Sequence, residues 1–239
     1  MKMRTISLSS PASSMIMMIM MITVIACVFL PGCAVTPKQG ALPSCESPLD
    51  PAVKNSCIVT PQALWRGAKP DAVAAAKLIA LGVKTIVNLE WLHDDRPSFQ
   101  NAVVPPIGRR EIDYFRVRDW EPLVAIAPGL VDEHVAHFLA ITRTQAKPIY
   151  VHCRSGKNRT GVMVAAYRVF NGASIEDAIA EMERYGGEWF AYDAQYIRSL
   201  TPVRRAVLER QIEAWIARLQ RDAQIVCTDA GCALSPMLP

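Results

Sequence analysis

Apolar residues recur along the chain with two different periods, and these periods predict strands that alternate with helices. Short apolar or alternating runs predict strands at residues 63–66, 84–89, 112–117 and 148–152. Apolar residues three and four positions apart predict helices at residues 71–81, 130–142, 160–170, 174–185 and 202–221. The alternation predicts one α/β domain, with a mostly parallel or mixed sheet of four to five strands flanked by helices.

Capping residues and apolar faces add detail to four of these helices. Asp71 precedes the first helix and Gly82 follows it, which is typical of helix ends. Ser174 begins another helix in a capping-box arrangement with Asp177. The residues expected to pack inward are Val131, Val135, Phe138 and Leu139 in one helix, and Val203, Val207, Ile212, Trp215 and Leu219 in the last.

The same pattern divides the chain into four parts. We expect an export signal at residues 1–32, a tether and irregular arm at 33–62, the folded domain at 63–221 and a tail at 222–239. Within the domain, long loops are expected at residues 90–110 and 119–128.

Composition excludes several classes of protein. The chain has 239 residues, of which 51% are hydrophobic and 20% charged, so a disordered polyelectrolyte is excluded. Seven cysteines are too few for a small disulfide scaffold of this length. The formal net charge of +4 is weak evidence for nucleic-acid binding, and we expect no nucleic-acid partner.

The first residues of the chain resemble a bacterial lipoprotein signal. Lys2 and Arg4 precede an apolar run from Met15 to Leu30, which is short for a membrane-spanning helix. Leu30-Pro31-Gly32-Cys33 then resembles a lipoprotein box, although Pro31 departs from the usual residue. The resemblance implies lipidation of Cys33, membrane anchoring and a periplasmic location, with the outer membrane favoured in a cell that has two membranes. An uncleaved anchor and cleavage without lipid are the alternatives.

Export would place the remaining cysteines in an oxidising compartment. We expect Cys45, Cys57, Cys227 and Cys232 to form two disulfides, as local pairs or as a bridge between the termini, with four free thiols as the alternative. Cys153 is the odd cysteine, and we expect it to remain free and reactive.

Residues 149–161 contain the most informative local pattern. An apolar strand ends at Cys153, a short loop follows, and Arg159 opens an apolar helix. Backbone N–H groups of such a loop, together with the helix N-terminus, can bind an anion and favour a thiolate at Cys153. Arg159 can hold two phosphate oxygens, and Gly156 permits unusual backbone angles. The expected phosphate-binding residues are Arg154, Ser155, Gly156, Lys157, Asn158 and Arg159.

His152-Cys153, five residues, then Arg159-Thr160 resembles the signature of cysteine-dependent protein phosphatases, specifically the bacterial exported dual-specificity and tyrosine type. The similarity extends over roughly residues 60–200, through Leu64-Trp65-Arg66-Gly67 upstream and Tyr167-Arg168 downstream. The resemblance implies that residues 63–221 form a phosphatase domain with a tyrosine-phosphatase-like fold. It also implies hydrolysis of phosphomonoesters through a cysteinyl-phosphate intermediate.

The resemblance assigns a role to each residue of the signature. Cys153 would be the nucleophile, and Arg159 with the loop amides would stabilise the transition state. Thr160 would donate a hydrogen bond to the thiolate. His152 would stiffen the loop, or would simply be a satisfied core histidine.

A general acid must also protonate the leaving oxygen, and Asp119 is the main candidate. It lies in Arg118-Asp119-Trp120-Glu121-Pro122, at a place that resembles the mobile acid loop of the family. Glu121 and Asp132 are the alternative candidates for the general acid. Asp119 would then be only a solvated charge in the loop. Asp94 and Asp95 are expected to be solvated or capping residues, with substrate contact as the alternative.

Two other kinds of site are not supported by the sequence. A nucleotide-binding P-loop fails because Val151 stands where its first glycine should be and Asn158 follows Lys157. No metal site or cofactor is expected, since the histidines and cysteines lack ligand spacing. His134 and His137 are expected to be a solvated pair on one helix face.

The substrate is expected to be a phosphorylated protein or a small phosphomonoester, with phosphotyrosine and phosphothreonine favoured. Arg154 and Lys157 make a basic rim similar to that of inositol polyphosphate or phosphoinositide phosphatases, so these phosphates are the second candidate substrates. Alternatively, the two side chains are simply solvent-exposed charges. A catalytically weak phosphate-binding module and an envelope scaffold without catalysis remain as alternatives of other classes.

Overall fold

A computed structural model describes residues 49–102, 112–223, 225–228 and 231–234. The predicted export signal, Cys33 and Cys45 lie outside these residues. In the described part of the chain, no helix is both long enough and apolar enough to cross a membrane.

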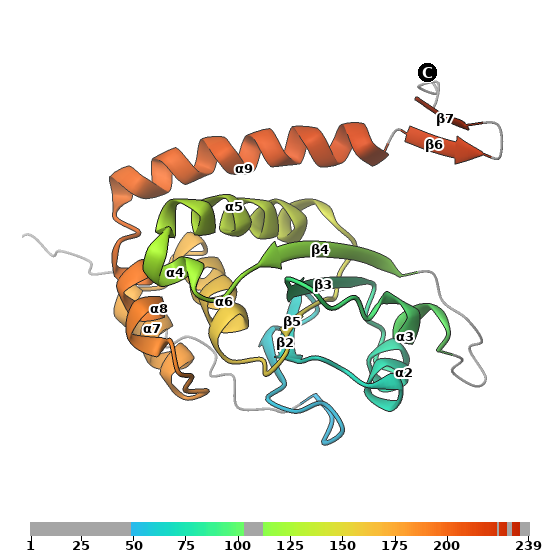
Figure 1. The fold of residues 1–239 in the computed structure, drawn as a ribbon, viewed down its shortest axis with the longest axis horizontal. Coiled ribbons are helices and arrows are strands. Elements are labelled where there is room, and N and C mark those ends of the chain that lie inside the picture. The colour runs from blue at the N-terminus through green and yellow to red at the C-terminus, as the bar shows by residue number, and fades with distance from the viewer. Residues whose placement is uncertain (1–48, 103–111, 224, 229–230, 235–239) are drawn as a thin grey trace, which may run out of the picture. The chain divides into compact units, whose positions relative to one another are not determined.

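A five-stranded mixed sheet forms the centre of the fold, in the order β1-β2-β5-β3-β4 (Figure 1). The strands are β1 (Cys57–Thr60), β2 (Leu64–Ala68), β3 (Thr85–Glu90), β4 (Asp113–Asp119) and β5 (Ile149–Cys153). Only β1 pairs antiparallel, with β2, and the other pairs are parallel. The predicted mixed α/β sheet is therefore confirmed.

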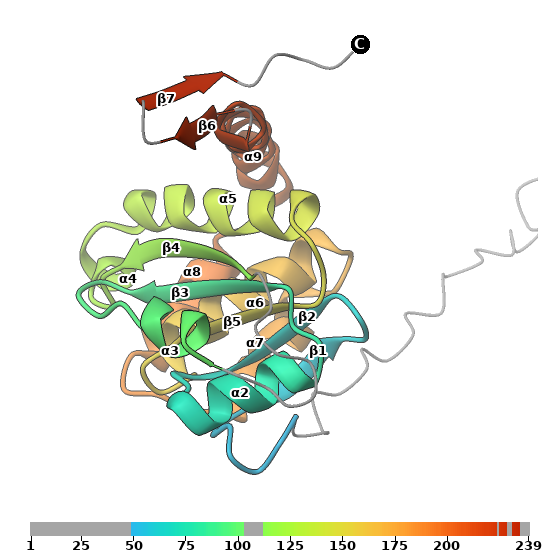
Figure 2. The same cartoon turned by 90° about the vertical axis from the view of Figure 1, so that its right-hand side faces the viewer.

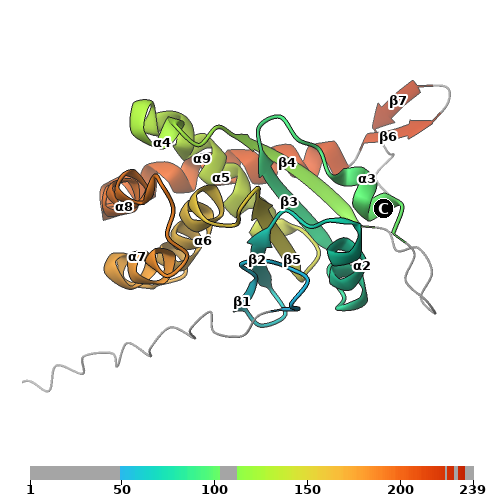
Figure 3. The same cartoon turned by 60° about the horizontal axis from the view of Figure 1, so that its bottom comes forward.

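Helices cover both faces of this sheet (Figures 2 and 3). One face packs against α2 (Ala72–Ala80) and α3 (Arg96–Gln100), with Ile86 and Tyr150 pointing toward it. The opposite face packs against α5 (Pro128–Thr144) and α6 (Asn158–Phe170), and Figure 2 shows α9 (Pro202–Ala223) lying on the outside of α5. The alternation of side chains along β3 and β5 supplies residues to both cores.

Two of the predicted helix caps are present. The Asp71 side chain accepts a hydrogen bond from the backbone N–H of Ala74 at 2.8 Å, and so begins α2. Ser174 likewise accepts from the N–H of Asp177 at the start of α7 (Ile175–Glu183). The predicted inward face of α5 is also confirmed, since Val131, Val135, Phe138 and Leu139 are all buried.

The arm predicted at residues 33–62 is wrong at its C-terminal end. Residues 57–60 form β1, and Cys57 and Val59 are buried in the core against β2. The prolines and polar residues nearby obscured a strand of only four residues, whose alternation is too short to detect. The folded domain thus begins before residue 63.

Two short helices occupy segments that were predicted to be loops: α3 within residues 90–110 and α4 (Leu123–Ile126) within residues 119–128. No element was predicted between residues 185 and 202, where the structure has α8 (Phe190–Arg198). The tail predicted at 222–239 contains a hairpin of β6 (Ile225–Thr228) and β7 (Gly231–Leu234). Helices as short as α3 and α4, with five and four residues, show little periodicity, because tertiary packing rather than propensity stabilises them.

The predicted inner face of α9 is wrong at its N-terminal end. Val203 and Val207 are 78% and 43% exposed, whereas Leu208 and Ile212 are buried. Val203 lies five residues before Leu208, which turns it about 140° away from the buried stripe. The first turn of α9 instead contacts α5 through Arg204, whose Nη2 donates a hydrogen bond to Oδ1 of Asp132 at 2.7 Å.

Candidate active site

Cys153 ends β5 at the centre of the sheet, where it is fully buried and free. The chain then turns through residues 154–157 and enters α6 at Asn158. β2 runs directly beside this strand, with Ala68 paired with Cys153. The signature residues are therefore brought together as predicted, with a strand before the loop and a helix after it.

Three carbonyl groups of the loop are held by residues outside it. The carbonyl of Arg154 accepts from the N–H of Lys69 at 3.4 Å, that of Ser155 from the side-chain amide of Asn55 at 2.8 Å, and that of Gly156 from the guanidinium of Arg66 at 2.6 Å. In a trans peptide the N–H points opposite to the carbonyl. The N–H groups of the next residues are therefore directed away from β2, as an anion-binding loop requires.

Position 156 requires glycine, because the backbone of β2 lies too close for any side chain. The φ angle of Gly156 is +72°, and a Cβ atom there would lie 2.5 Å from the backbone carbon of Gly67. Only glycine fits both the backbone angle and the space. The expectation of unusual backbone angles at this position is confirmed.

The guanidinium of Arg159 is held at the ends of two neighbouring strands. Its Nη1 donates to the carbonyls of Leu89 and Asp119 at 3.3 and 3.2 Å, and its Nη2 lies 3.7 Å from Oε2 of Glu121. Its Nε is buried and has no hydrogen-bond partner among the described residues, so this donor is not used within the protein.

Thr160 and His152 are buried next to the loop, in the protein interior. Thr160 is fully buried, and its hydroxyl has no hydrogen-bond partner among the described residues. His152 is also fully buried, and its Nε2 lies 3.3 Å from Oδ2 of Asp95, without hydrogen-bond alignment. Burial lowers the pKa of His152, although Asp95 acts in the opposite direction.

Asp95 was expected to be solvated or capping; it is not solvated, and it occupies the N-cap position of α3 without a side-chain capping hydrogen bond. It is 3% exposed, and its Oδ1 accepts hydrogen bonds from the Asn88 amide and the Tyr114 hydroxyl. Asp94 remains at the surface, where its carboxylate accepts from the N–H of Arg96 and pairs with Arg116. Asp95 is therefore a buried carboxylate in contact with His152.

The side chains of the loop residues fall into two groups. Arg154 is exposed and Lys157 is half-buried, so both can lie at the rim. Asn158 was expected to bind phosphate, but its side-chain amide donates to Oδ2 of Asp193 in α8 at 3.0 Å. Only the backbone of Asn158 remains for an anion at the helix N-terminus.

Asp193 is a buried polar residue of this region that sequence reasoning missed. It is 2% exposed, and burial raises its pKa to about 7, against the hydrogen bond from Asn158 and with the help of Glu121 and Asp119. The spacing of Phe190, Ala194 and Ile197 at i, i+4 and i+7 was the available signal for α8.

The structure brings two of the three candidate acids to Arg159. Asp119 ends β4, is 4% exposed, and places Oδ1 3.0 Å from Nδ1 of His134. Glu121 is half-buried, and burial raises its pKa despite the nearby Arg159. Asp132 is not a candidate for the general acid, because its Oδ1 already accepts hydrogen bonds from Tyr196 and Arg204.

The expected solvated pair of histidines is wrong for both residues. His134 contacts Asp119, and His137 stacks on Trp215 with 3.9 Å between ring centroids. Burial lowers the pKa of His137 to about 4. Within the described residues, no cluster of three or more His, Cys, Asp or Glu side chains is placed to hold a metal ion.

Cys57 is disulfide-bonded, and its partner lies outside the residues whose side chains are described. This confirms the predicted oxidation state of Cys57 but leaves its pairing a prediction. In the tail, the backbones of Cys227 and Cys232 face each other across the β6–β7 hairpin, and their side chains are not among those described.

Comparison with known proteins defines the class. A family model described as "PTP-NADK: DSP-PTPase phosphatase fused to NAD+ Kinase" matches residues 53–198, which is more than half of the chain. The chain belongs to this family of dual-specificity-type phosphatases, as its signature predicted.

Two curated relatives and one solved structure illustrate the similarity. The chain is 30% identical over 145 residues to the dual specificity protein phosphatase TpbA of Pseudomonas aeruginosa strain UCBPP-PA14, covering 60% of each chain. It is 25% identical over 122 residues to the inositol diphosphatase DSP4 of Arabidopsis thaliana, covering 51% of this chain and 59% of the relative. It thus spans about 60% of the length of these relatives.

The solved structure is a variant of P. aeruginosa TpbA in complex with phosphotyrosine. It has a TM-score of 0.53 and 26% identity, and the similarity covers 73% of this chain and 97% of that one. The tyrosine-phosphatase-like fold is thereby confirmed.

Proposed function

We propose that the protein hydrolyses phosphomonoesters through a phosphorylated Cys153. The observation that carries the proposal is the loop itself. A free, buried cysteine lies at its base, three of its carbonyls are turned away by outside donors, and Arg159 is fixed by two strand ends. This arrangement supplies a nucleophile and positive charge at one place.

In the first step, the Cys153 thiolate attacks phosphorus while the bond to the leaving oxygen breaks. Asp119 gives its proton to that oxygen, and the loop amides with Arg159 stabilise the equatorial oxygens. In the second step, the Asp119 carboxylate takes a proton from water, whose oxygen attacks phosphorus. The phosphorus–sulfur bond breaks, inorganic phosphate leaves, and Thr160 stabilises the returning thiolate through its buried hydroxyl. No metal ion or organic cofactor enters this scheme.

We infer that phosphotyrosine and phosphothreonine in proteins are the main substrates. The names of the TpbA relatives and the phosphotyrosine complex of one of them support this inference. Inositol polyphosphates are the second candidate class, supported by the exposed Arg154, the half-buried Lys157 and the name of the DSP4 relative.

Hydrolysis of para-nitrophenyl phosphate by residues 34–239, with EDTA and reductant present, tests the proposal. Wild type is expected to turn over, Cys153→Ser to be inactive, and Arg159→Lys to lose about 100-fold or more, because lysine lacks the planar fork. Absence of turnover in reduced, folded wild type would contradict the proposal and favour a phosphate-binding module. Comparing a phosphotyrosine peptide with an inositol polyphosphate then decides between the substrate classes.

We further propose that the protein is exported and anchored in the membrane through a lipidated Cys33. The lipoprotein-like box in the sequence and the disulfide at Cys57 support this location, since disulfides persist in oxidising compartments. Labelling with a radioactive fatty acid tests it. Label in the full-length wild type and none in Cys33→Ser is expected, and equal labelling of the two would contradict lipidation at this residue.

A further inference from the structure

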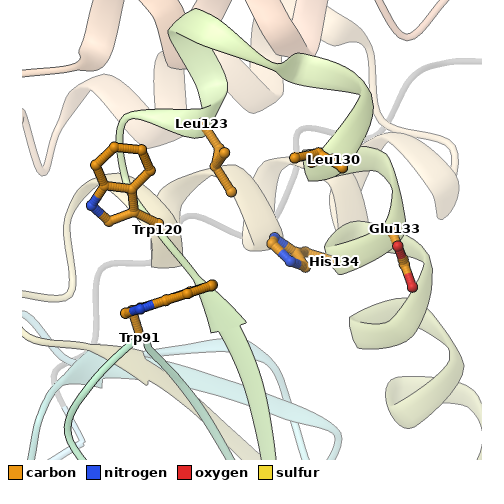
Figure 4. Close-up of a pocket in the computed structure, with 6 residues that line it drawn as sticks. All are labelled: Trp91, Trp120, Leu123, Leu130, Glu133 and His134. Atoms are coloured by element: carbon orange, nitrogen blue, oxygen red, sulfur yellow. The ribbon is translucent and has the colours of Figure 1, made fainter.

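An apolar cavity of about 450 Å3 lies among the ends of two strands and the helices that follow them (Figure 4). Trp91 follows β3, Trp120 follows β4, and the other lining residues come from α4 and α5. In Figure 4 the two indole rings lie on one side of the cavity and Leu130 on the other. The complete lining is Trp91, Trp120, Leu123, Leu130, Glu133 and His134.

The lining exposes large apolar side chains that do not serve the core. Trp91 and Trp120 are each 48% exposed, and Leu130 is 53% exposed. Tryptophan is usually well buried, and two half-exposed tryptophans at one cavity indicate a surface that buries them against a ligand. Such a surface gains free energy when an apolar group displaces water from it.

The charges of the lining exclude one class of ligand. Glu133 and His134 are its only polar residues, and no lysine or arginine belongs to it. A second phosphate group of a substrate would therefore meet an apolar wall and a carboxylate here. The cavity fits an apolar group and opposes a polyphosphorylated one.

The cavity is continuous with the elements that hold Arg159. The carbonyls of Leu89 and Asp119 accept from Arg159, and the strands they belong to are paired, with Glu90 opposite Asp119. Trp91 and Trp120 directly follow this pair of residues. The cavity is therefore lined by residues that directly follow the strand ends to which Arg159 is bonded, and a phosphate bound by Arg159 would lie near it.

His134 provides a second link to the same place. It lines the cavity, and its Nδ1 lies 3.0 Å from the side chain of Asp119. An apolar group in the cavity would also shield this contact from water, which strengthens electrostatic interactions at the site.

We propose that this cavity binds a large aliphatic or aromatic side chain next to the phosphorylated residue of a peptide substrate. The inference rests on the proposed function and narrows its substrate class to phosphoproteins with an apolar residue beside the phosphate-bearing one. One such side chain in an apolar pocket changes the specificity constant by about 10-fold or more.

Two short phosphotyrosine peptides test the proposal, one with leucine and one with serine on both sides of the phosphotyrosine. For wild type, kcat/KM is expected to favour the leucine peptide by about 10-fold. Trp91→Ala and Leu130→Ala are each expected to reduce this ratio to below about 3. Leu92→Ala is the matched control, because Leu92 is 78% exposed beside Trp91 but does not line the cavity.

Binding of the same peptides to Cys153→Ser, measured by calorimetry, gives a readout that does not depend on turnover. Equal affinities for the two peptides, or a preference that survives both cavity variants, would overturn the proposal. The proposed function would still stand in that case if wild type hydrolyses the serine peptide and Cys153→Ser does not. If neither peptide is hydrolysed, the proposed function fails, and the calorimetric preference still decides what the cavity binds.

Discussion

The imidazole Nδ1 of His134 lies 3.0 Å from Oδ1 of Asp119, and the backbone carbonyl of the same aspartate accepts from Arg159 at 3.2 Å. Asp119 therefore connects α5 to the residue proposed to bind phosphate. His134 is a positioning residue in this arrangement, since it acts through Asp119 and lies beside the apolar cavity.

Removal of this contact is expected to impair protonation of the leaving group. His134→Ala should lower kcat for phenyl phosphate about 10-fold, and Asp119→Asn about 100-fold or more. Both losses should be smaller for para-nitrophenyl phosphate, because nitrophenolate leaves without a proton. A structural defect alone would lower both rates equally. Glu121→Gln is the comparison variant, and a larger leaving-group dependence there would transfer the acid role to Glu121.

The buried Asp193 is expected to make stability depend on pH. Its pKa is 3.8 in the unfolded reference and about 7 in the folded protein, so the folded state keeps this proton longer. The resulting stabilisation is complete below about pH 4 and disappears as pH rises through about 7. It amounts to at most about 4 kcal/mol.

Asp193→Asn should remove this dependence, because asparagine is neutral and its Oδ1 can still accept from Asn158. Urea unfolding from about pH 5 to about pH 8 measures it. The free energy of unfolding of the variant relative to wild type should rise across this range. A constant difference between the two proteins would show that Asp193 is ionised throughout.

Alanine substitutions at two glycines with positive φ angles distinguish the cost of backbone strain from the cost of a steric clash. Gly156→Ala should lower the free energy of unfolding by about 2 kcal/mol or more and abolish measurable turnover, because its Cβ would meet Gly67. Gly172 has a φ angle of +93° and no atom within 4 Å of a Cβ, so Gly172→Ala should cost only about 1 kcal/mol and keep activity. Equal behaviour of the two variants would contradict the packing of β2 against the loop.

Substitution by alanine should have different effects on stability at the N-terminal end of α9 and in its buried middle. Ile212→Ala should destabilise the protein by about 3 kcal/mol, since Ile212 is fully buried. Val203→Ala should change stability by about 0.5 kcal/mol or less, since Val203 is largely exposed. Thermal or urea unfolding of both variants checks the packing of α9.

The residues that could be predicted from the sequence are those that act within one short stretch. Cys153, Gly156 and Arg159 lie in a single strand, loop and helix start, so the local pattern was enough to place them. The mostly parallel character of the sheet also followed from the alternation of elements, whereas the order of its strands was not predicted and β1 was missed. That strand depends on pairing with β2 rather than on its own four residues.

The contacts that could not be predicted join residues far apart in the chain. Asp95 beneath His152, Asp193 against Asn158 and His134 against Asp119 each depend on how separate elements pack. Packing gave two of these residues partners at the site: Asp95, expected to be solvated or capping, and His134, expected to be solvated. The cavity between Trp91 and Trp120 has the same origin, because it exists only where β3 and β4 end side by side.

The central claim is that phosphate passes through Cys153, and trapping the intermediate tests it most directly. Asp119→Asn is mixed with para-nitrophenyl phosphate, whose leaving group needs no proton, quenched with acid within the first turnover, digested and analysed by mass spectrometry. The account predicts one phosphoryl group on the peptide that contains Cys153, and none when Cys153→Ser is added to the same chain. Turnover by the wild type with no phosphoryl group on Cys153 in the quenched samples, or with the group on another residue, would contradict it.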